Sequence, residues 1–445
     1  MKQVLIFCLV LSQSVFAQQE LLQSGPMLGY SGFREVMIWV QTTSQASVKI
    51  GYFKSGEESR FTEVVETSKE GDFIAKLYPQ DLEYGQRYNY VVYINGEALS
   101  FDYPLFFQSQ ALWQWRSDPP AFSFAIGSCY YANESKDDRP GKAYGGEYQI
   151  FDAIHKKAPD FMMWLGDNTY LRTPDFLSKT GIRHRYRHAR SLPELQPLLS
   201  SVHHYAIWDD HDYGPNDADR SYVNKQLTES AFNDYWGNPN TDVTGKGGIT
   251  GQFMWQDVAF FLLDNRYHRA PNKSKQEGKD LLGGYQIDWL IDALRSSRAP
   301  FKFVCVGGQT ISNAAVYENY AAYPEERASL LQRIEEEKIE GVIFLSGDRH
   351  HTEISKMPRA DSYPLYDLTC SPLTSGTHRP KDENNDFLLK DKTYYERNFG
   401  IVSISGPRTD RQLQLTIYNS EGQSQWGFKV SARELRYPRK QKKYD

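Results

Sequence analysis

The densest group of side chains able to do chemistry lies at residues 207–217, in the sequence IWDDHDYGPND. An apolar run leads there into four aspartates and a histidine: Asp209, Asp210, His211, Asp212 and Asp217. Two carboxylates about 4 Å apart repel each other by about 1 kcal/mol in water and by about 4 kcal/mol at the effective dielectric of a protein surface. Either these aspartates point apart into solvent, or a positive charge such as a metal ion holds them together.

Three other apolar runs also end in side chains that can bind metals. Cys129 comes directly after the run AIGS. Asp167 comes directly after WLG, and Tyr170 lies three residues further on. Asp348 comes directly after FLSG, and His350 lies two residues further on. One turn can bring the Asp167 carboxylate and the Tyr170 phenol to the same point, and the alternate spacing of Asp348 and His350 predicts that both lie on one side of an extended chain. Ligands of open α/β sheets gather at the carboxyl ends of strands. The sequence therefore predicts that these strand ends converge.

The types of these side chains indicate which metals they would hold. Thiolate, phenolate and imidazole ligands suit a transition metal such as iron, whereas oxygen ligands suit calcium, magnesium or manganese. The mixture predicts two unlike metals that share Asp167. Plainer alternatives remain: Cys129 as a core residue or half of a disulfide, and Tyr170 as a packing tyrosine.

Several neighbouring polar residues and thiols are predicted not to be ligands. Asn216 and Asp217 follow Gly-Pro and are interpreted as turn formers, and His351 as a residue behind the site or at the surface. Cys305 and Cys370 lie in apolar runs and are interpreted as core thiols. With Cys129 they make an odd number in the mature chain, so at least one thiol lacks an internal partner.

Strands and helices alternate from about residue 111 to the end of the chain. Strands are predicted at FSFAIGSC, FMMWLGD, KFVCVGGQ and VIFLSGD, and helices between them at residues 145–160, 283–298 and 324–341. The helix at 283–298 places Ile287, Leu290, Ile291 and Leu294 on one face. This alternation predicts an α/β layered domain over residues 111–445.

Residues 18–110 predict a different, all-β unit. Strand-like runs lie at EVMIWVQT and ASVKIGYF, and Tyr88, Tyr90 and Val92 alternate before the tight-turn pair Asn95-Gly96. The pattern is typical of an immunoglobulin-like or fibronectin-like sandwich. The net charge of −5 offers no basic surface for nucleic acid.

Residues 1–17, MKQVLIFCLVLSQSVFA, have the pattern of a signal peptide for the general secretory route. A lysine precedes a short apolar run, and small residues follow at the spacing of a cleavage site. The run is too short to span a bilayer, and no later segment is long enough. We therefore expect an exported protein that is periplasmic or secreted, with no membrane span.

Taken together, the motifs GSC, LGDNTY, WDDHDYGPND, FLLDNRYHR, GGQT, LSGDRHH and LTCSPLTSG resemble the PhoD-like branch of the metallophosphatase superfamily, the alkaline phosphatase D family. GDNTY is also similar to the Gly-Asp-x-x-Tyr motif of purple acid phosphatases. The resemblance implies an α/β sandwich of two mixed sheets flanked by helices, preceded by a β-sandwich. It also implies Fe³⁺ and Ca²⁺ as cofactors, although other divalent metals fit the ligand types.

The resemblance implies a role for each motif residue. The iron would be surrounded by Cys129, Asp167, Tyr170 and His350, and the calcium site faced by Asp167, Asp210 and Asp348. No histidine in CVGGQT matches the Val-x-x-His of the superfamily, so the ligand there is unassigned.

The function that follows is hydrolysis of phosphate esters by a metal-held hydroxide that attacks phosphorus in line. Two cations would neutralise the phosphoryl oxygens and lower the pKa of bound water. His211 would bind a phosphoryl oxygen or protonate the leaving oxygen. Arg266 and Asn168 would grip phosphate oxygens, and an equal alternative for Arg266 is a structural role as the partner of Asp264. Two alternatives stay open: a calcium-stabilised extracellular binding or adhesion protein without catalysis, and a nuclease or phospholipase on the same metal site.

Overall fold

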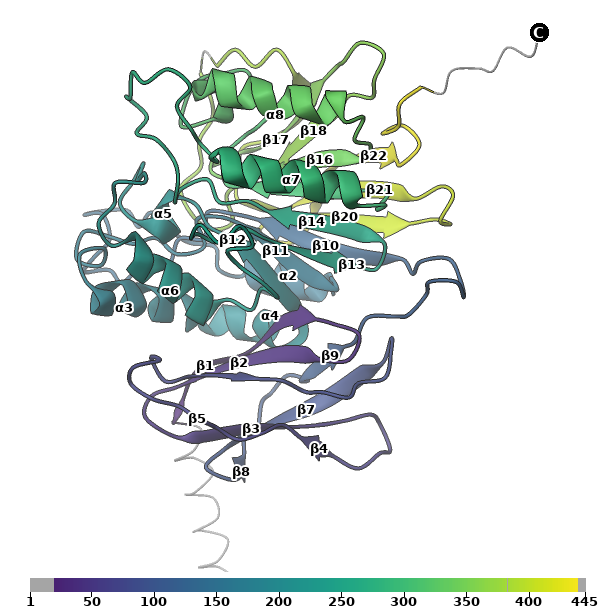
Figure 1. The fold of residues 1–445 in the computed structure, drawn as a ribbon. Helices are drawn as coiled ribbons and strands as arrows, with labels where there is room; N and C mark the ends of the chain where they lie inside the picture. The colour runs from purple at the N-terminus through teal and green to yellow at the C-terminus, as the bar shows by residue number, and fades with distance from the viewer. Residues whose placement is uncertain (1–19, 382, 439–445) are drawn as a thin grey trace, which may run out of the picture.

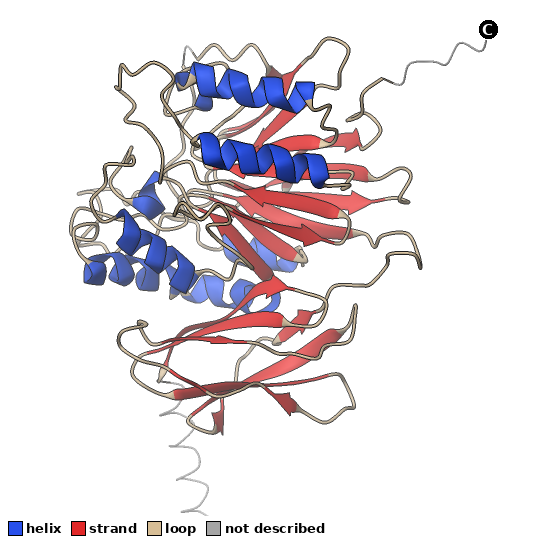
Figure 2. Ribbon diagram, viewed as in Figure 1, coloured by secondary structure: helices blue, strands red, loops and turns tan. Residues whose placement is uncertain are grey.

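The structure is a computed structural model that describes residues 20–381 and 383–438, so the signal peptide predicted for residues 1–17 lies outside the described residues. Two large sheets pack face to face, and a smaller sheet lies beside them at the N-terminal end (Figure 1). Helices flank the two large sheets, as Figure 2 shows by element type. No helix in the described part of the chain is long and apolar enough to cross a membrane.

The first large sheet has nine strands. Its order is β22 (Ser424–Ser431), β21 (Gln412–Asn419), β20 (Asn398–Ser405), β10 (Phe122–Gly127), β11 (Phe161–Leu165), β12 (His203–Ile207), β1 (Leu22–Ser31), β2 (Val36–Thr42) and β6 (Ile74–Leu77). β10, β11 and β12 are parallel neighbours. Their carboxyl ends therefore lie at one edge of the sheet.

The second large sheet has seven strands. Its order is β13 (Gly251–Trp255), β14 (Val258–Leu262), β15 (Lys302–Val306), β16 (Val342–Ser346), β18 (Leu365–Thr369), β17 (Thr352–Met357) and β19 (Leu388–Tyr394). The rings of Phe124 on β10 and Phe260 on β14 meet edge to face with centroids 5.2 Å apart, and Phe303 on β15 lies 5.4 Å from Phe124. Aromatic side chains thus fill the core between the two sheets.

Helices cover the outer faces of these sheets. α7 (Gly284–Ser296) and α8 (Pro324–Glu336) lie over the seven-stranded sheet (Figure 1), and the four apolar residues predicted for one face of α7 are buried. α2 (Ile150–Lys156) and α4 (Gln196–Ser201) contact β20 and β1 of the other sheet. The remaining helical segments are α3 (Lys179–Arg190), α5 (Asp210–Tyr213), α6 (Lys225–Tyr235), η1 (Pro193–Leu195) and η2 (Tyr320–Ala322). The predicted α/β layered architecture is confirmed.

Residues 22–108 contain only strands among their regular elements. The smaller sheet has the order β4 (Arg60–Phe61), β3 (Ser47–Phe53), β7 (Arg87–Ile94) and β8 (Glu97–Ala98), with β5 (Val65–Glu66) beside β3 and β9 (Phe106–Gln108) beside β7. Tyr88, Tyr90 and Val92 alternate inward on β7 as predicted. They belong to a second hydrophobic core between this sheet and β1, β2 and β6.

Strands β1 and β2 form a wall shared by the two hydrophobic cores, and the sequence did not predict this arrangement. β1 pairs in parallel with β12, with Leu28 opposite His203, so the N-terminal strands β1, β2 and β6 continue the nine-stranded sheet. Every residue of β2 is buried: Trp39 belongs to the large core, whereas Ile38 and Val40 belong to the N-terminal core. Alternation along a strand tells which residues share a face, but it does not tell which strand lies at the next edge.

Candidate metal centre

The polar segments that follow β10, β11, β12 and β16 converge at one end of the two large sheets. Cys129 lies two residues beyond β10, Asp167 two beyond β11, and Asp210 begins α5 just after β12. Asp348 and His350 follow β16 of the other sheet. The predicted convergence of strand ends therefore takes place between the two sheets.

Four of these residues have strained backbones. Cys129, Asp167, Asp348 and His350 have φ values of 57°, 53°, 65° and 54°, in the left-handed region that side chains with a Cβ rarely adopt. Such strain costs about 1–3 kcal/mol per residue and clusters at functional sites. Asp348 and His350 were predicted to share one side of an extended chain, and this was wrong, because both residues have left-handed backbone conformations.

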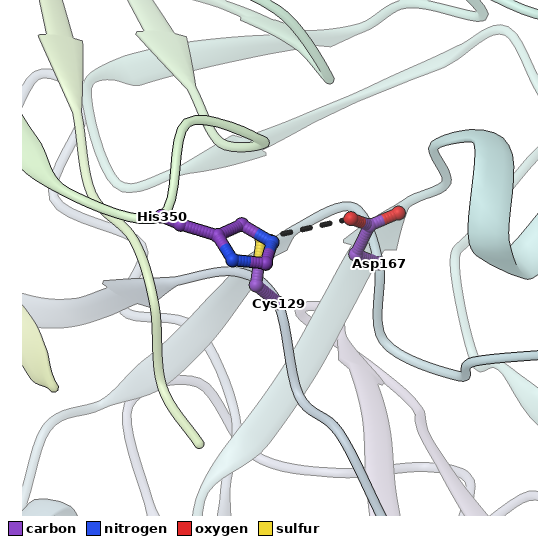
Figure 3. Close-up of side chains that lie close together, drawn as sticks. All are labelled: Cys129, Asp167 and His350. Atoms are coloured by element: carbon purple, nitrogen blue, oxygen red, sulfur yellow. Dashed lines mark hydrogen bonds between the residues drawn. The ribbon is translucent and has the colours of Figure 1, made fainter. Parts of the chain in front are cut away.

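Cys129, Asp167 and His350 form the first group that could hold a metal ion. One ligand atom of each lies within 4.8 Å of the others, and the Cys129 Sγ is 3.6 Å from the Asp167 Oδ2. Figure 3 shows the three side chains meeting from separate segments. The Tyr170 hydroxyl lies 3.3 Å from both the Asp167 Oδ2 and the His350 Nε2. The four residues predicted around iron therefore lie together.

The protonation states in this group favour a strongly positive ligand. Burial, and next the charge of Asp348, raise the pKa of the Cys129 thiol to about 12. Burial and the charge of Asp167 also raise the pKa of Tyr170 well above its usual value, while burial lowers the pKa of His350 and keeps it neutral. A metal cation makes thiolate and phenolate favourable in such a site and binds neutral imidazole directly.

A second group shares Asp167. It consists of Asp167, Asp210 and His211, and the ring of His211 stacks on Tyr170 with centroids 4.2 Å apart. Burial and then the charge of Asp210 raise the pKa of Asp167 well above its usual value. Two groups with one carboxylate in common match the sequence-based expectation of paired sites around Asp167.

Asp348 lies near this second group but is not a member of it. Its Oδ2 atom is buried and has no hydrogen-bond partner within residues 20–381 and 383–438. Burial and then the charge of Asp209 raise its pKa to about 8. The Oδ2 atom has one long ion pair, with the Arg349 Nε at 4.0 Å, so a cation bound beside this carboxylate would stabilise it further.

A third group, of Asp210, Asp217 and Glu318, was not predicted. The backbone N–H of Asp217 donates to the Asp210 Oδ2 over 2.7 Å, so Asp217 shapes the turn as expected and also faces the centre. Glu318 lies in the loop between β15 and η2. Its sequence neighbourhood, VYENY, carries no pattern that marks a ligand.

Arg266 and Asn168 do not lie where a substrate-gripping role requires. The Arg266 guanidinium is buried, donates from Nε to the Asp209 Oδ1 over 2.5 Å and pairs with the Glu318 Oε2 at 2.8 Å. The Asn168 side chain is also buried, and its Nδ2 donates to the carbonyl of Ile207 over 2.7 Å. This placement is at odds with the predicted contact of either residue with phosphate.

Gln309 stands where the superfamily's Val-x-x-His motif has its histidine, and its side chain contacts other side chains near the centre. Gln309 of CVGGQT donates from Nε2 to the Glu353 Oε1 over 2.7 Å and accepts from Arg349 over 3.1 Å. The segment therefore holds neighbours of the centre and supplies no member of the three groups. Sequence reasoning also missed Tyr144, whose hydroxyl lies 3.1 Å from the His350 Nδ1 and fixes that ring.

The three cysteines of the described chain are free and buried. Cys305 and Cys370 lie in the large core, as predicted. The Ser371 hydroxyl donates to the Cys129 Sγ over 3.1 Å, so the thiol at the centre is oriented by a hydrogen bond.

Comparison with known proteins identifies the family. A profile described as PhoD-like phosphatase matches residues 124–412. This chain belongs to the PhoD-like phosphatase family. A second profile, described as a domain of unknown function (DUF7800), matches residues 19–107.

Individual relatives of this PhoD-like chain are distant in sequence and close in fold. Alkaline phosphatase D of Bacillus subtilis (strain 168) is 22% identical over 286 residues, which are 54% of this chain and 47% of that protein. The chain thus matches about half the length of that relative. The solved structure of PhoD has a TM-score of 0.71 at 15% identity and 91% coverage of both chains. A purple acid phosphatase, PPD1 of yellow lupin, has a TM-score of 0.67 at 11% identity, covering 92% of this chain and 75% of that one.

Every member of the three metal groups of this PhoD-like chain except Cys129 lines a cavity of about 670 Å³. Asp167, Tyr170, Asp210, His211 and His350 face it, and Arg266 and Asn168 do not. This volume is in the range of small-molecule sites, so it holds the organic part of a substrate as well as a phosphoryl group. The donor set fits two dissimilar cations, because soft and hard ligands separate around one shared carboxylate.

Proposed function

We propose that this protein is an exported metal-dependent phosphoesterase that hydrolyses phosphate esters. The observation that carries the proposal is the pairing of two ligand groups, one with Cys129 and His350 and one with Asp210 and His211, around the single carboxylate of Asp167. Membership of the PhoD-like phosphatase family supports the same reaction class.

We propose Fe³⁺ for the group of Cys129, Asp167, Tyr170 and His350. We propose Ca²⁺ for the site faced by Asp167, Asp210 and Asp348, where another divalent metal would also fit the oxygen ligands. The thiol and the phenol support a transition metal in the first group, and the oxygen-rich second group supports a hard cation. When bound, the two cations would neutralise phosphoryl oxygens and lower the pKa of the attacking water.

The protein's own residues would orient the ester. His211 faces the cavity, and its buried Nδ1 has no hydrogen-bond partner among the described residues. Burial lowers its pKa, so the ring is neutral and its N–H can bind a phosphoryl oxygen; to protonate the leaving oxygen, the ring would first have to take up a second proton. Arg266 would act by holding Asp209 and Glu318 in place behind the metal groups, and Asn168 by fixing the segment after Asp167.

We further propose that residues 1–17 direct export by the general secretory route. Residues 18–110 would then be an N-terminal β-sandwich and residues 111–445 the catalytic domain. The two family profiles, which end at residue 107 and begin at residue 124, support this division.

Metal analysis combined with an activity assay tests the proposal. The purified protein is expected to contain iron and a second metal, and to hydrolyse 4-nitrophenyl phosphate or its bis-ester. Full chelation should abolish both activities, and adding back the measured metals should restore them. Activity that survives complete chelation would overturn the metal-dependent reaction, and absence of iron would overturn the mixed-metal assignment.

The role of His211 can be separated from metal binding. His211→Ala should keep the metal content of the Cys129 group and lose about 10²–10⁴-fold in kcat. His268→Ala is the matched control, because His268 lies outside the cavity. Wild-type kcat in His211→Ala would show that the assigned role is wrong.

A further inference from the structure

Two arginines at the cavity form no ion pair among the described residues, although the charge of Arg172 interacts with that of Asp138. Arg139 and Arg172 line the same cavity as the metal groups. Across residues 20–381 and 383–438, neither guanidinium forms an ion pair or a hydrogen bond. Arg349, which also lines the cavity, differs because its guanidinium is held by both Glu383 oxygens at 2.9 and 2.8 Å. Two positive charges therefore remain available to a ligand.

Aromatic rings hold these two arginines in place. The Arg139 guanidinium lies 4.0 Å from the ring centroid of Tyr144, and that of Arg172 lies 5.7 Å from Tyr131. The Tyr131 ring meets Tyr144 and Tyr170 edge to face, with centroids 4.9 and 5.0 Å away. A guanidinium over a ring gains cation–π attraction and keeps its N–H groups free.

The same tyrosines contact the metal groups, which places the arginines beside the reaction centre. Tyr144 touches His350 through its hydroxyl, and Tyr170 lies between Asp167 and His350. The residue before Arg172 is tied to the second metal group, because the Leu171 N–H donates to the carbonyl of His211 over 3.0 Å. Arg172 thus follows directly on a segment anchored at the centre.

The charge of the substrate decides what such free arginines can do. A phosphate monoester has a second pKa near 6 and carries two negative charges above that pH, whereas a diester carries one. The planar fork of arginine fits the additional phosphoryl oxygen and does not lose its charge. A diester places an organic group at that position and gives the fork no charged oxygen to bind.

We propose that Arg172, assisted by Arg139, makes this site select phosphate monoesters over diesters. The inference rests on the proposed phosphoesterase function and specifies its substrate class. Arg172 would bind the phosphoryl oxygen that a diester lacks, and Arg139 would add a weaker attraction from the outer side of the cavity.

The test compares kcat/KM for 4-nitrophenyl phosphate and for bis(4-nitrophenyl) phosphate at pH 8. Arg172→Gln should lower the monoester value by about 10–100-fold, the usual effect of one charge-assisted hydrogen bond, and the diester value by less than about threefold. Arg139→Gln should show a smaller change in the same direction, and Arg172→Lys a smaller loss than Arg172→Gln. Arg87→Gln is the control, since Arg87 also lies over a ring, Phe106, but outside the cavity.

Binding provides a second measurement that does not depend on turnover of the monoester. The inhibition constant of inorganic phosphate against diester hydrolysis should rise about 10–100-fold in Arg172→Gln, while that of dimethyl phosphate stays within about threefold. Metal content and Tm of each variant are measured alongside. If Arg172→Gln loses metal, Arg172→Lys and Arg139→Gln decide the question.

The outcomes separate the two proposals. A wild-type protein that hydrolyses neither ester overturns the phosphoesterase function itself. A wild-type protein that hydrolyses esters, with an unchanged ratio of monoester to diester activity in all three variants, overturns the assignment of Arg172 and Arg139 alone. A ratio that falls in Arg172→Gln and not in Arg87→Gln supports it.

Discussion

Without the proposed metals, the free energy of unfolding of this protein should fall as the pH rises. In the metal-free site, burial and then the charge of Asp209 raise the pKa of Asp348 to about 8, whereas an unfolded aspartate has a pKa of about 3.9. The fold therefore favours the protonated form of Asp348. Its contribution to stability is fully present below about pH 4 and is lost as the pH rises through about 8.

The size of this effect follows from the cost of keeping one carboxyl group protonated. Each pH unit above 3.9 costs about 1.4 kcal/mol, so neutral Asp348 costs about 1.5 kcal/mol at pH 5 and about 5.5 kcal/mol at pH 8. The free energy of unfolding of the metal-free protein should thus fall by about 4 kcal/mol between these pH values. At about 2 °C per kcal/mol, the Tm should fall by about 8 °C.

Calorimetric scans of chelator-treated protein at pH 5 and pH 8 measure this fall. Asp348→Asn is permanently neutral and nearly isosteric with the protonated acid, so its Tm should fall by about 8 °C less than that of the wild type over this range. Asp292→Asn, at an exposed position of α7, is the control and should behave like the wild type. If metal-free Asp348→Asn loses stability with pH as steeply as the wild type, the account of the buried carboxyl groups is refuted.

Two further substitutions test the supports of the centre. Tyr144→Phe removes the hydrogen bond to the His350 Nδ1, so metal affinity at that group should fall by about 10–100-fold in a competition titration with a chelator. An unchanged affinity would show that the His350 ring needs no such anchor. Arg266→Met removes the ion partner of the buried Asp209 carboxylate, while Glu318 keeps its ion pair with Arg269, and should lower the free energy of unfolding in urea by about 3–5 kcal/mol. A loss under about 1 kcal/mol would contradict this reading of the ion pairs.

The sequence predicted which residues gather at the centre better than it predicted the residues that support them. Cys129, Asp167 and Asp210 could be found because each follows a short apolar strand by two or three residues, and parallel strands bring such ends together. Tyr170 could be found because it lies only three residues after Asp167, so one turn brings the two side chains together. These predictions depend on one strand and one turn at a time, and local geometry decides them.

Residues that act through distant partners could not be predicted in this way. Arg266 was expected to grip phosphate, yet Asp209, 57 positions earlier in the chain, is buried and takes the guanidinium as its partner. Glu318 lies in the loop between β15 and η2, far in sequence from Asp210 and Asp217. Pairing of buried charges is decided by the tertiary fold, and a single sequence does not show which carboxylate will be buried beside which arginine.

The shared wall between the two cores has a consequence for the N-terminal strands. β1 covers the edge of β12, the strand that leads to Asp210. The Ser31 N–H donates to the Tyr205 hydroxyl over 3.0 Å, and the Trp39 Nε1 donates to the carbonyl of Asp234 over 3.0 Å. An unpaired β12 would expose backbone groups and one face of the large core.

The two units predicted from sequence should therefore unfold together. Trp39 lies on the large-core face of β2 although it belongs to the N-terminal strands, and Trp39→Ala should cost about 3–5 kcal/mol. Because both cores depend on the wall formed by β1 and β2, that loss should lower the Tm of a single calorimetric transition that also responds to metal. Ile50→Ala, within the N-terminal core alone, should lower the same transition. The contrary result is two separate calorimetric transitions, in which metal shifts only the transition that Ile50→Ala leaves unchanged. That result would show that the shared sheet does not couple the N-terminal strands to the metal centre.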